Sequence, residues 1–465
     1  MGFTTLGRLL SSPTPSELET SVEVGLEGNH VILYIIAGLI CGQLIKHFAN
    51  ITKLPYTPIL AIFGLAVGFV DKELGNWGKG AILISNINPH TFFLIFLPPL
   101  IFESAFSIDW HTIKQEIIQI LILAGPLLVV NAFVTAFAMR HILQYDGEFT
   151  FEAALMFGSL ISATDPVAVV SVMKELGASR TLTTMIEGES LINDGTAFVM
   201  FSVTLDLVKG KPFQLHEITI AFTRLSLGGP IFGIISGIVI SFWLKRIVNN
   251  SILETNLTIV SAYSVFYLAE SWKLEVSGIL TLVSLGLYMT KVGKTHISHQ
   301  SEETFHHILS YLGYACETLV FIIAGTIIAI KVFEGDSSIG LKDWIKLVAL
   351  YVILHVIRFG MIYTLKWPMS KLGYGLSWAQ ATVLGFSGMR GAVSLILSVI
   401  VYLDGSIDQY IRDIVMFHTA GIAMMTLVIN GSLMGYIIKK LGLMRMNEVK
   451  KKMVKNLMKA YRKEV

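Results

Sequence analysis

The chain has 465 residues, of which 53% are hydrophobic and 15% are charged, and its mean hydropathy is +0.67. A soluble domain carries about 25% charged residues, so this composition excludes an ordinary soluble domain and indicates a membrane protein with many spans. The net charge is only +2, no nucleic-acid partner is expected, and two isolated cysteines exclude a disulfide framework.

Apolar segments of membrane-spanning length recur along most of the chain, and short connections separate them. We therefore expect an all-α polytopic membrane protein with about thirteen transmembrane helices. The expected spans are 31–48, 57–70, 90–105, 115–140, 151–173, 180–208, 220–247, 254–271, 275–291, 304–331, 341–365, 377–403 and 408–438.

The distribution of lysine and arginine predicts the orientation, because basic residues concentrate in cytoplasmic loops. The side that holds the C-terminus is the more basic one, with Lys46, Lys174 and Arg180 among its residues and further lysines in the tail. The C-terminus is therefore expected in the cytoplasm and the N-terminus outside, in a multi-pass protein of the plasma membrane. This division gives an extracellular or luminal segment (1–30), a transmembrane domain (31–438) and a basic tail (439–465).

The tail spaces apolar residues at Met453, Leu457 and Tyr461 on a helical period between its lysines. Such a basic amphipathic helix is expected either to lie on anionic lipid or to dock a regulatory partner. A solvated linker is the alternative, and in either case we expect a further cytoplasmic regulatory region to follow.

Charged residues inside the expected spans are costly, at about 2.5–3.5 kcal/mol each, and by default mark an ion path. Asp165 lies about fourteen residues into its span, roughly 21 Å, which is near the middle of the membrane. Pro166 disfavours helix at Asp165, so this span should break there, where freed polar groups need a protein or water-filled environment.

The next span carries the stretch "EGESLINDG", in which Glu187, Ser190 and Asp194 share one helix face. Glu189 points elsewhere and is expected to be structural or to lie near the cytoplasmic entrance. In the twelfth span, Gly388 and Gly391 flank Arg390 and should loosen the helix at the same depth.

The two predicted breaks fall in equivalent spans, the fifth member of each of two six-span sets around a central seventh span. Spans offset by seven insert in opposite directions, as in the inverted repeats of secondary transporters, whose substrate site lies where the broken helices cross. The sequence therefore predicts two inverted six-helix repeats with broken helices crossing at mid-membrane.

Five segments, in order, resemble the signatures of sodium/proton exchangers of the monovalent cation:proton antiporter superfamily, and the resemblance covers about residues 30–438. The segment "TDPVAVVSVMKELGASRTLTTMIEGESLINDG" is most similar to the plant salt-tolerance and sperm-type branch. The five signatures are "FLPPLIFESAF", "ISATDPVAVV", "EGESLINDGTA", "ETLVFIIAGT" and "GFSGMRGAVSL".

The resemblance implies a homodimeric antiporter that exchanges sodium for protons and takes part in pH regulation, with no cofactor beyond its transported ions. It implies a sodium site on the side chains of Asp165, Ser190 and Asp194 and the backbone of Thr164, with Glu103 as a further carboxylate. It also implies two structural ion pairs, Glu187 with Arg390 and Glu317 with Arg358. Asn193 would be the uncharged member of an Asn-Asp pair, which goes with electroneutral exchange.

The chemistry of the site follows from its residue types. A desolvated carboxylate favours its protonated form, and a nearby cation favours the ionised form, so Asp194 can hold a proton or a cation but not both. Carboxylate, hydroxyl and carbonyl oxygens are the ligands that hard cations prefer.

Several alternatives stay open. The same fold allows a pH or cation sensor with minor transport, or exchange of potassium for protons. Two other classes are disfavoured. A channel would need a filter-like repeat, which the sequence lacks, and an intramembrane aspartyl protease would need a Gly-x-Gly-Asp type context, which neither aspartate has.

Overall fold

The computed structural model describes residues 15–52, 55–71, 73–86, 88–145, 149–210, 215–247, 250–271, 274–296, 299–333 and 339–443. Within these ranges the regular elements are helices, as predicted. Nearly all of the predicted basic tail (439–465) and the first fourteen residues lie outside the described residues.

Each of the thirteen predicted spans falls on a helix or on a broken pair of helices. The first six comprise α2 (Pro15–Thr52), α3 (Tyr56–Phe69), α5 (Pro89–Ser107), α6 (Trp110–Ala124), α7 (Pro126–His141), α8 (Phe151–Ser162), α9 (Val167–Glu175) and α10 (Arg180–Val208). The others comprise α11 (Leu215–Leu244), α12 (Ser251–Ser271), α13 (Gly278–Lys291), α14 (His299–Ile327), α15 (Leu341–Met369), α16 (Trp378–Phe386), α17 (Ala392–Leu403), α18 (Gln409–Met425) and α19 (Gly431–Lys440).

Some short elements were not predicted. Helix α4 (Asn76–Ser85) lies between the second and third spans, and a short 3-10 turn, η1 (Gly293–His296), precedes α14. The π-helical turn η2 (Ile328–Phe333) continues α14. A second π-helical turn, η3 (Thr426–Asn430), connects α18 to α19. By length and apolar composition, ten helical stretches of the described ranges can each cross a membrane, so the total of thirteen spans stays a prediction.

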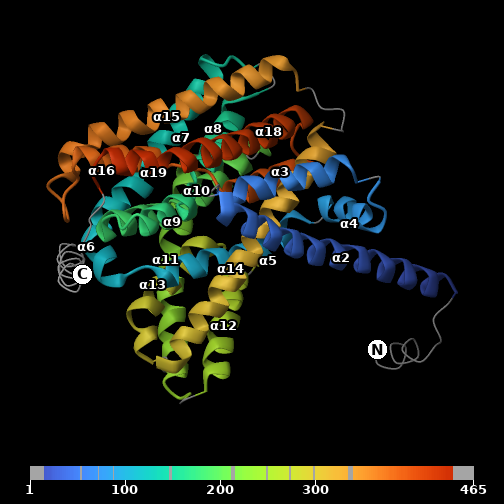
Figure 1. Cartoon of the computed structure of the whole chain (residues 1–465), viewed down its shortest axis with the longest axis horizontal. Helices are drawn as coiled ribbons and strands as arrows, with labels where there is room; N and C mark the ends of the chain where they lie inside the picture. The colour runs from blue at the N-terminus through green and yellow to red at the C-terminus, as the bar shows by residue number, and fades with distance from the viewer. Residues whose placement is uncertain are drawn as a thin grey trace, which may run out of the picture.

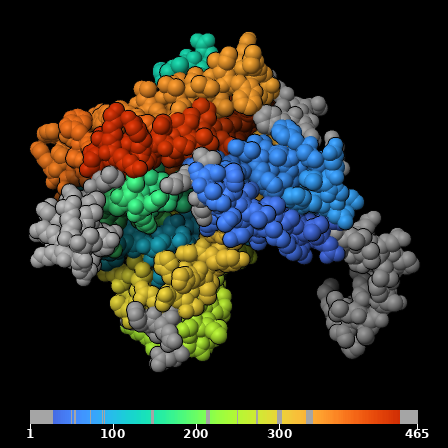
Figure 2. Space-filling view, in the orientation of Figure 1, coloured from blue at the N-terminus to red at the C-terminus, as the bar shows by residue number. Residues whose placement is uncertain are grey.

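The helices form a bundle with two visible parts (Figure 1). Helices α15, α16, α18 and α19 lie together along one side, and α11, α12 and α13 form a lobe at the opposite side. Helix α14 packs against α3 and α5, and α8 packs against α7 and α10. The space-filling view is notched between the blue end of α2 and the yellow lobe (Figure 2).

The outer helices expose apolar side chains, which a lipid environment accommodates. The apolar side chains that are at least half exposed include Ile231, Ile235 and Ile238 of α11 and Ile36 and Ile40 of α2. Rows of large exposed apolar residues are rare on water-soluble monomers. The surface therefore agrees with an integral multi-pass membrane protein.

Three spans are interrupted. The breaks between α8 and α9 and between α16 and α17 are the two that the sequence predicts. The backbone N–H of Asp165 donates a 2.7 Å hydrogen bond to the carbonyl of Met389, which joins these two breaks and confirms that the broken helices cross. A third break, at Gly125 before Pro126, separates α6 from α7 and was not predicted.

Every carbonyl from 160 to 164, at the end of α8 and just beyond it, receives a side-chain donor from α10, from α17 or from the second break. The Ser394 hydroxyl is shared between Leu160 and Ala163, the Arg390 Nε donates to Ile161, and the Asn193 amide donates to Ser162. The Ser190 hydroxyl donates to Thr164. These donors replace the helical hydrogen bonds that the break removes, which is the condition for broken backbone inside a membrane.

The second break is supported in the same way. Arg358 donates to the carbonyl of Leu384, the Asn430 amide donates to Phe386, and the Arg390 guanidinium donates to Gly388. Arg390 therefore serves both breaks, since it also donates to the end of α8.

Candidate ion-binding site

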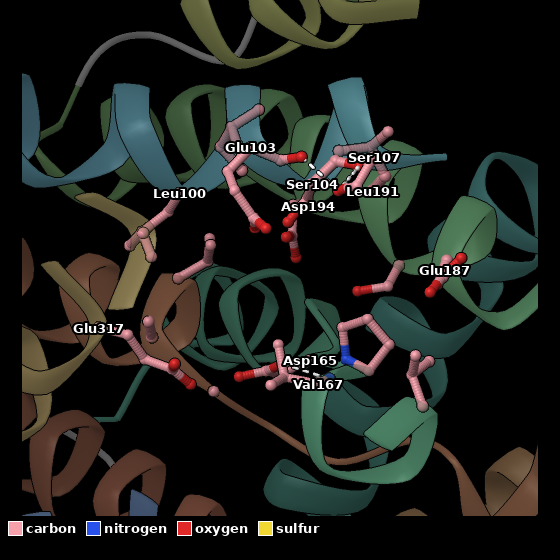
Figure 3. Close-up of a pocket in the computed structure, with 18 of the residues that line it drawn as sticks. Leu100, Glu103, Ser104, Ser107, Asp165, Val167, Glu187, Leu191, Asp194 and Glu317 are labelled. Carbon is pink, nitrogen blue, oxygen red and sulfur yellow. Dashed lines mark hydrogen bonds between the residues drawn. The ribbon is translucent and has the colours of Figure 1, made fainter. Parts of the chain in front are cut away.

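A cavity of about 410 Å³ lies beside the crossing of the broken helices. Carboxylates from four elements line it: Glu103 of α5, Asp165 of the first break, Asp194 of α10 and Glu317 of α14. Figure 3 shows Glu103 and Asp194 on one side of the cavity and Asp165 and Glu317 across from them. The structure thus brings together acidic side chains that lie more than 200 residues apart in the sequence.

Asp194 is held in the cavity wall with its carboxylate free. Its side chain is 8% exposed, and its Oδ1 has no hydrogen-bond partner among the described residues. A buried carboxylate oxygen without a partner favours binding of a proton or a cation. The role that the sequence predicts for Asp194, to hold either a proton or a cation, stays a prediction.

Asp165 lies where the second halves of both broken helices begin. Its Oδ1 accepts a 2.9 Å hydrogen bond from the N–H of Val167, the first residue of α9. Its Oδ2 lies against Gly391, immediately before α17. Helix N-termini favour negative charge, and the Asp165 carboxyl lies where the N-termini of the two half-helices meet.

Arg390 has the complementary position at the two C-terminal ends, because it donates to carbonyls at the end of α8 and just beyond α16. The side chain is almost fully buried. Helix C-termini favour positive charge. Asp165 and Arg390 thus match the opposite helix ends that meet at the crossing.

The remaining predicted ligands divide between the cavity and its support. Ser190, Thr164 and Glu103 line the cavity, and the Ser310 hydroxyl lies 3.5 Å from Glu103. Asn193 is buried behind the cavity wall, where its amide donates to the Ser162 carbonyl at 2.9 Å and to the Thr164 hydroxyl at 3.1 Å.

The predicted pair of Glu187 and Arg390 is wrong. Glu187 bonds to Lys174 at 2.8 Å, with its side chain partly exposed at the edge of the cavity. The buried carboxylate of this stretch is Glu189, which pairs with Arg358 at 2.9 Å. Since residues two apart point to different helix faces, Glu189 faces the buried arginine and Glu187 faces the cavity mouth.

The predicted pair of Glu317 and Arg358 is wrong as well. The carboxylate of Glu317 accepts a hydrogen bond from the Tyr56 hydroxyl of α3, whereas Arg358 bonds to Glu189 and to the Leu384 carbonyl. Glu317 therefore belongs to the lining of the cavity, and Arg358 supports the second break.

Some residues of the site carried no clear signal in the sequence. Asn430 bonds to Tyr351, His355 and Phe386, and the only local sign was an amide within an apolar run. Ser394 is four residues after Arg390 on the second half-helix, a spacing that places both near the first break. Lys46 and Tyr56 come from the first two spans, so only the fold brings them to the cavity.

Two broken helices that cross beside an acidic cavity, within a bundle of apolar helices, define the architecture of a secondary membrane transporter. Residues 31–440 match the family model described as "Sodium/hydrogen exchanger, transmembrane". The chain belongs to the sodium/hydrogen exchanger family, a family of transporters.

Characterised relatives agree with this family. The chain is 34% identical over 439 residues to sodium/hydrogen exchanger 7 of Arabidopsis thaliana. The matched region is 93% of this chain and 38% of the relative. It is 30% identical to the Na(+)/H(+) antiporter ApNhaP of Aphanothece halophytica, with 91% and 76% covered. Mouse solute carrier family 9 member C1 is 25% identical. These plant and mouse relatives confirm the predicted resemblance to the plant and sperm-type branch.

The chain spans 38% and 60% of the lengths of two plant exchangers that it matches, exchangers 7 and 8 of Arabidopsis thaliana. The fold is also that of a solved structure, the sodium proton antiporter MjNhaP1 from Methanocaldococcus jannaschii. The TM-score is 0.74 at 17% identity, over 89% of this chain and 99% of that one.

Proposed function

We propose that this chain exchanges a monovalent cation, sodium, for a proton across a membrane, and that both ions compete for Asp194. The observation that carries the proposal is the placement of Asp194 and Asp165 on one cavity beside the crossing of the broken helices. The names of the relatives, which are sodium/proton exchangers and antiporters, support the same ions.

Competition at Asp194 couples the two ions. The Oδ1 of this buried carboxylate has no partner in the described part of the chain, and it gains one when it binds either a proton or a cation. Ser190 and Thr164 add oxygen atoms to the same cavity wall. One carboxylate that is occupied by only one of the two ions, combined with alternating access, gives exchange without a separate proton path.

Exchange is one for one in this proposal. Asn193, beside Asp194, is uncharged and bonded to the end of α8, so it carries no ion of its own. One sodium ion then replaces one proton, and no net charge crosses the membrane in a cycle.

We propose that the cavity opens to the cytoplasm. Its lining includes Lys46 near the end of α2, Ser107 at the end of α5 and Lys174 at the end of α9. These helix ends all belong to the side that the distribution of basic residues assigns to the cytoplasm.

The protein would work in the plasma membrane as a homodimer, with its regulatory partner beyond the described residues.

The test is proton flux in reconstituted vesicles, followed with an internal pH dye after a sodium gradient is imposed. We expect sodium-driven flux in the wild-type protein that does not change when the membrane potential is clamped at different values. If the proton flux responds only to a potassium gradient, potassium and not sodium is the exchanged cation. A steady current without proton movement would refute exchange.

A further inference from the structure

A lysine lies over aromatic rings at the mouth of the cavity. The ammonium of Lys46 on α2 is 3.8 Å from the ring centroid of Tyr314 on α14 and 5.8 Å from that of Tyr56 on α3. The two rings are 6.1 Å apart, and all three residues line the cavity. Aromatic faces attract cations, so this corner of the cavity is built to hold a positive charge.

The aromatic pair leads directly to the carboxylates deeper in the cavity. The Tyr56 hydroxyl donates to one oxygen of Glu317, and the other oxygen, Oε1, has no partner among the described residues. Glu317 is 8% exposed and shares the cavity with Asp165. A cation that enters past Tyr314 would therefore meet Glu317 before it reaches the crossing of the helices.

Lys46 differs from the other lysine at the mouth. Lys174 is neutralised by Glu187 at 2.8 Å on the facing wall. No described carboxylate lies within ion-pair distance of Lys46, which is half-buried. Within the described part of the chain, its ammonium contacts the two rings. The positive charge of Lys46 therefore acts through space on the carboxylates of the cavity, Glu317 among them, without a direct ion pair.

We propose that Lys46 is a tethered cation that competes with the transported cation at the mouth of the cavity and thereby sets the apparent affinity for that ion. The inference rests on the proposed function, which supplies the competing cation. A sodium ion and the Lys46 ammonium carry the same charge and are drawn to the same rings and the same carboxylates. Entry of one requires the flexible lysine stem to move aside.

The test replaces Lys46 by methionine, because Lys46→Met keeps an apolar stem over the rings and removes only the charge. Sodium is titrated on the side of the cavity mouth while proton flux is measured in reconstituted vesicles. We expect the KM for sodium to fall about three- to tenfold, with a much smaller change in maximal rate. This is the size of the repulsion between one fixed charge and a sodium ion at an effective dielectric constant of a few tens. Lys46→Arg, which keeps the charge, should stay within about twofold of wild type.

Lys366 provides the matched control. Its ammonium also lies 3.8 Å from an aromatic ring, that of Trp378, but it does not line the cavity. Lys366→Met should leave the KM unchanged. The Lys46→Met effect should also shrink when a large, non-transported salt such as N-methylglucamine chloride is added, because salt screens a solvated charge.

Sodium-dependent thermal stabilisation of the purified protein gives a readout that does not need transport. The sodium concentration at half-maximal stabilisation should fall in Lys46→Met by a factor similar to that in KM, and Lys46→Gln serves if the methionine variant does not fold. A KM that is unchanged or raised in both variants, while the wild type exchanges sodium for protons, overturns this inference alone. A wild type without sodium-driven proton flux overturns the proposed function and this inference with it.

Discussion

The Asn193 amide nitrogen lies 2.9 Å from the carbonyl oxygen of Ser162 and donates a hydrogen bond to the broken end of α8. The same amide donates to the Thr164 hydroxyl at 3.1 Å. Asn193 thus fixes the first helix break to α10, directly beside Asp194. Asn193 therefore supports the break structurally, in addition to the uncharged role that is proposed for it in exchange.

Replacing Asn193 by aspartate should therefore destabilise the protein rather than simply add an ion site. An ionised aspartate offers only acceptors to the Ser162 carbonyl, so Asn193→Asp either leaves this carbonyl unpaired or must retain a proton. We expect a loss of about 1–3 kcal/mol in the free energy of unfolding, more at alkaline than at acidic pH. Unfolding in mixed micelles measures it, and a variant as stable as wild type at pH 8 would contradict the assigned contact.

Glu187 and Glu189 are two residues apart and should respond very differently to the same substitution. Glu189→Gln leaves Arg358 buried without its counter-charge and should cost about 3–5 kcal/mol. Glu187→Gln breaks a pair whose lysine side chain is 65% exposed and should cost at most about 1 kcal/mol. Unfolding of the two variants side by side tests the assignment, and equal losses would show that the pairs are misassigned.

Gly391 leaves no room for a side chain beside Asp165. A Cβ at this position would lie 2.0 Å from the Asp165 Oδ2 and 2.3 Å from its Cβ. Gly391→Ala should displace Asp165 and lower sodium-driven proton flux at least about tenfold, the change expected for about 1.4 kcal/mol.

Gly360 of α15 is the control for this glycine, since a Cβ there meets no atom of the described residues within 4 Å. Gly360→Ala should keep wild-type flux and gain about 0.5–1 kcal/mol in stability, because alanine favours helix. Full activity in Gly391→Ala would mean that Asp165 need not occupy its observed position.

Asp109 precedes α6 and connects it to Arg180, the first residue of α10, at 3.3 Å. The Thr112 hydroxyl, 2.8 Å away, and Arg180 hold the pKa of Asp109 below its usual range. A carboxyl whose folded pKa is lowered contributes stability above its unfolded pKa of about 3.9, and this stability is lost as the pH falls through the folded value.

The difference in melting temperature between wild type and Asp109→Asn should therefore be present at pH 7 and decrease in strong acid, where Asp109 takes up a proton. Thermal unfolding at several pH values measures this difference. A difference that is absent at pH 7, or that persists unchanged in strong acid, would contradict the lowered pKa of Asp109.

The sequence was sufficient to predict the fold because the relevant signals are local. Apolar length marked each span, and Pro166 and the glycines around Arg390 marked the two breaks. The break at Gly125 was missed although Pro126 follows it, because the surrounding run is uniformly apolar and has no ionisable residue.

The pairing of charges was beyond the sequence. Glu187 and Glu189 both belong to a stretch of acidic residues on α10, and the choice of arginine depends on how α10 faces α15 and α17. Glu317 pairs with a tyrosine 261 residues away, and no spacing rule predicts this contact. Side-chain partners across helices require the packed structure.

In the proposed exchange a proton and a cation compete for Asp194, and sodium binding measured across pH is the direct test of this competition. Calorimetric titration of the purified protein should show the apparent Kd for sodium rising about tenfold for each unit that the pH falls, as expected when one proton must leave. Asp194→Asn should abolish both the binding and its pH dependence. Sodium affinity that is independent of pH, or retained in Asp194→Asn, would show that the two ions do not compete for Asp194.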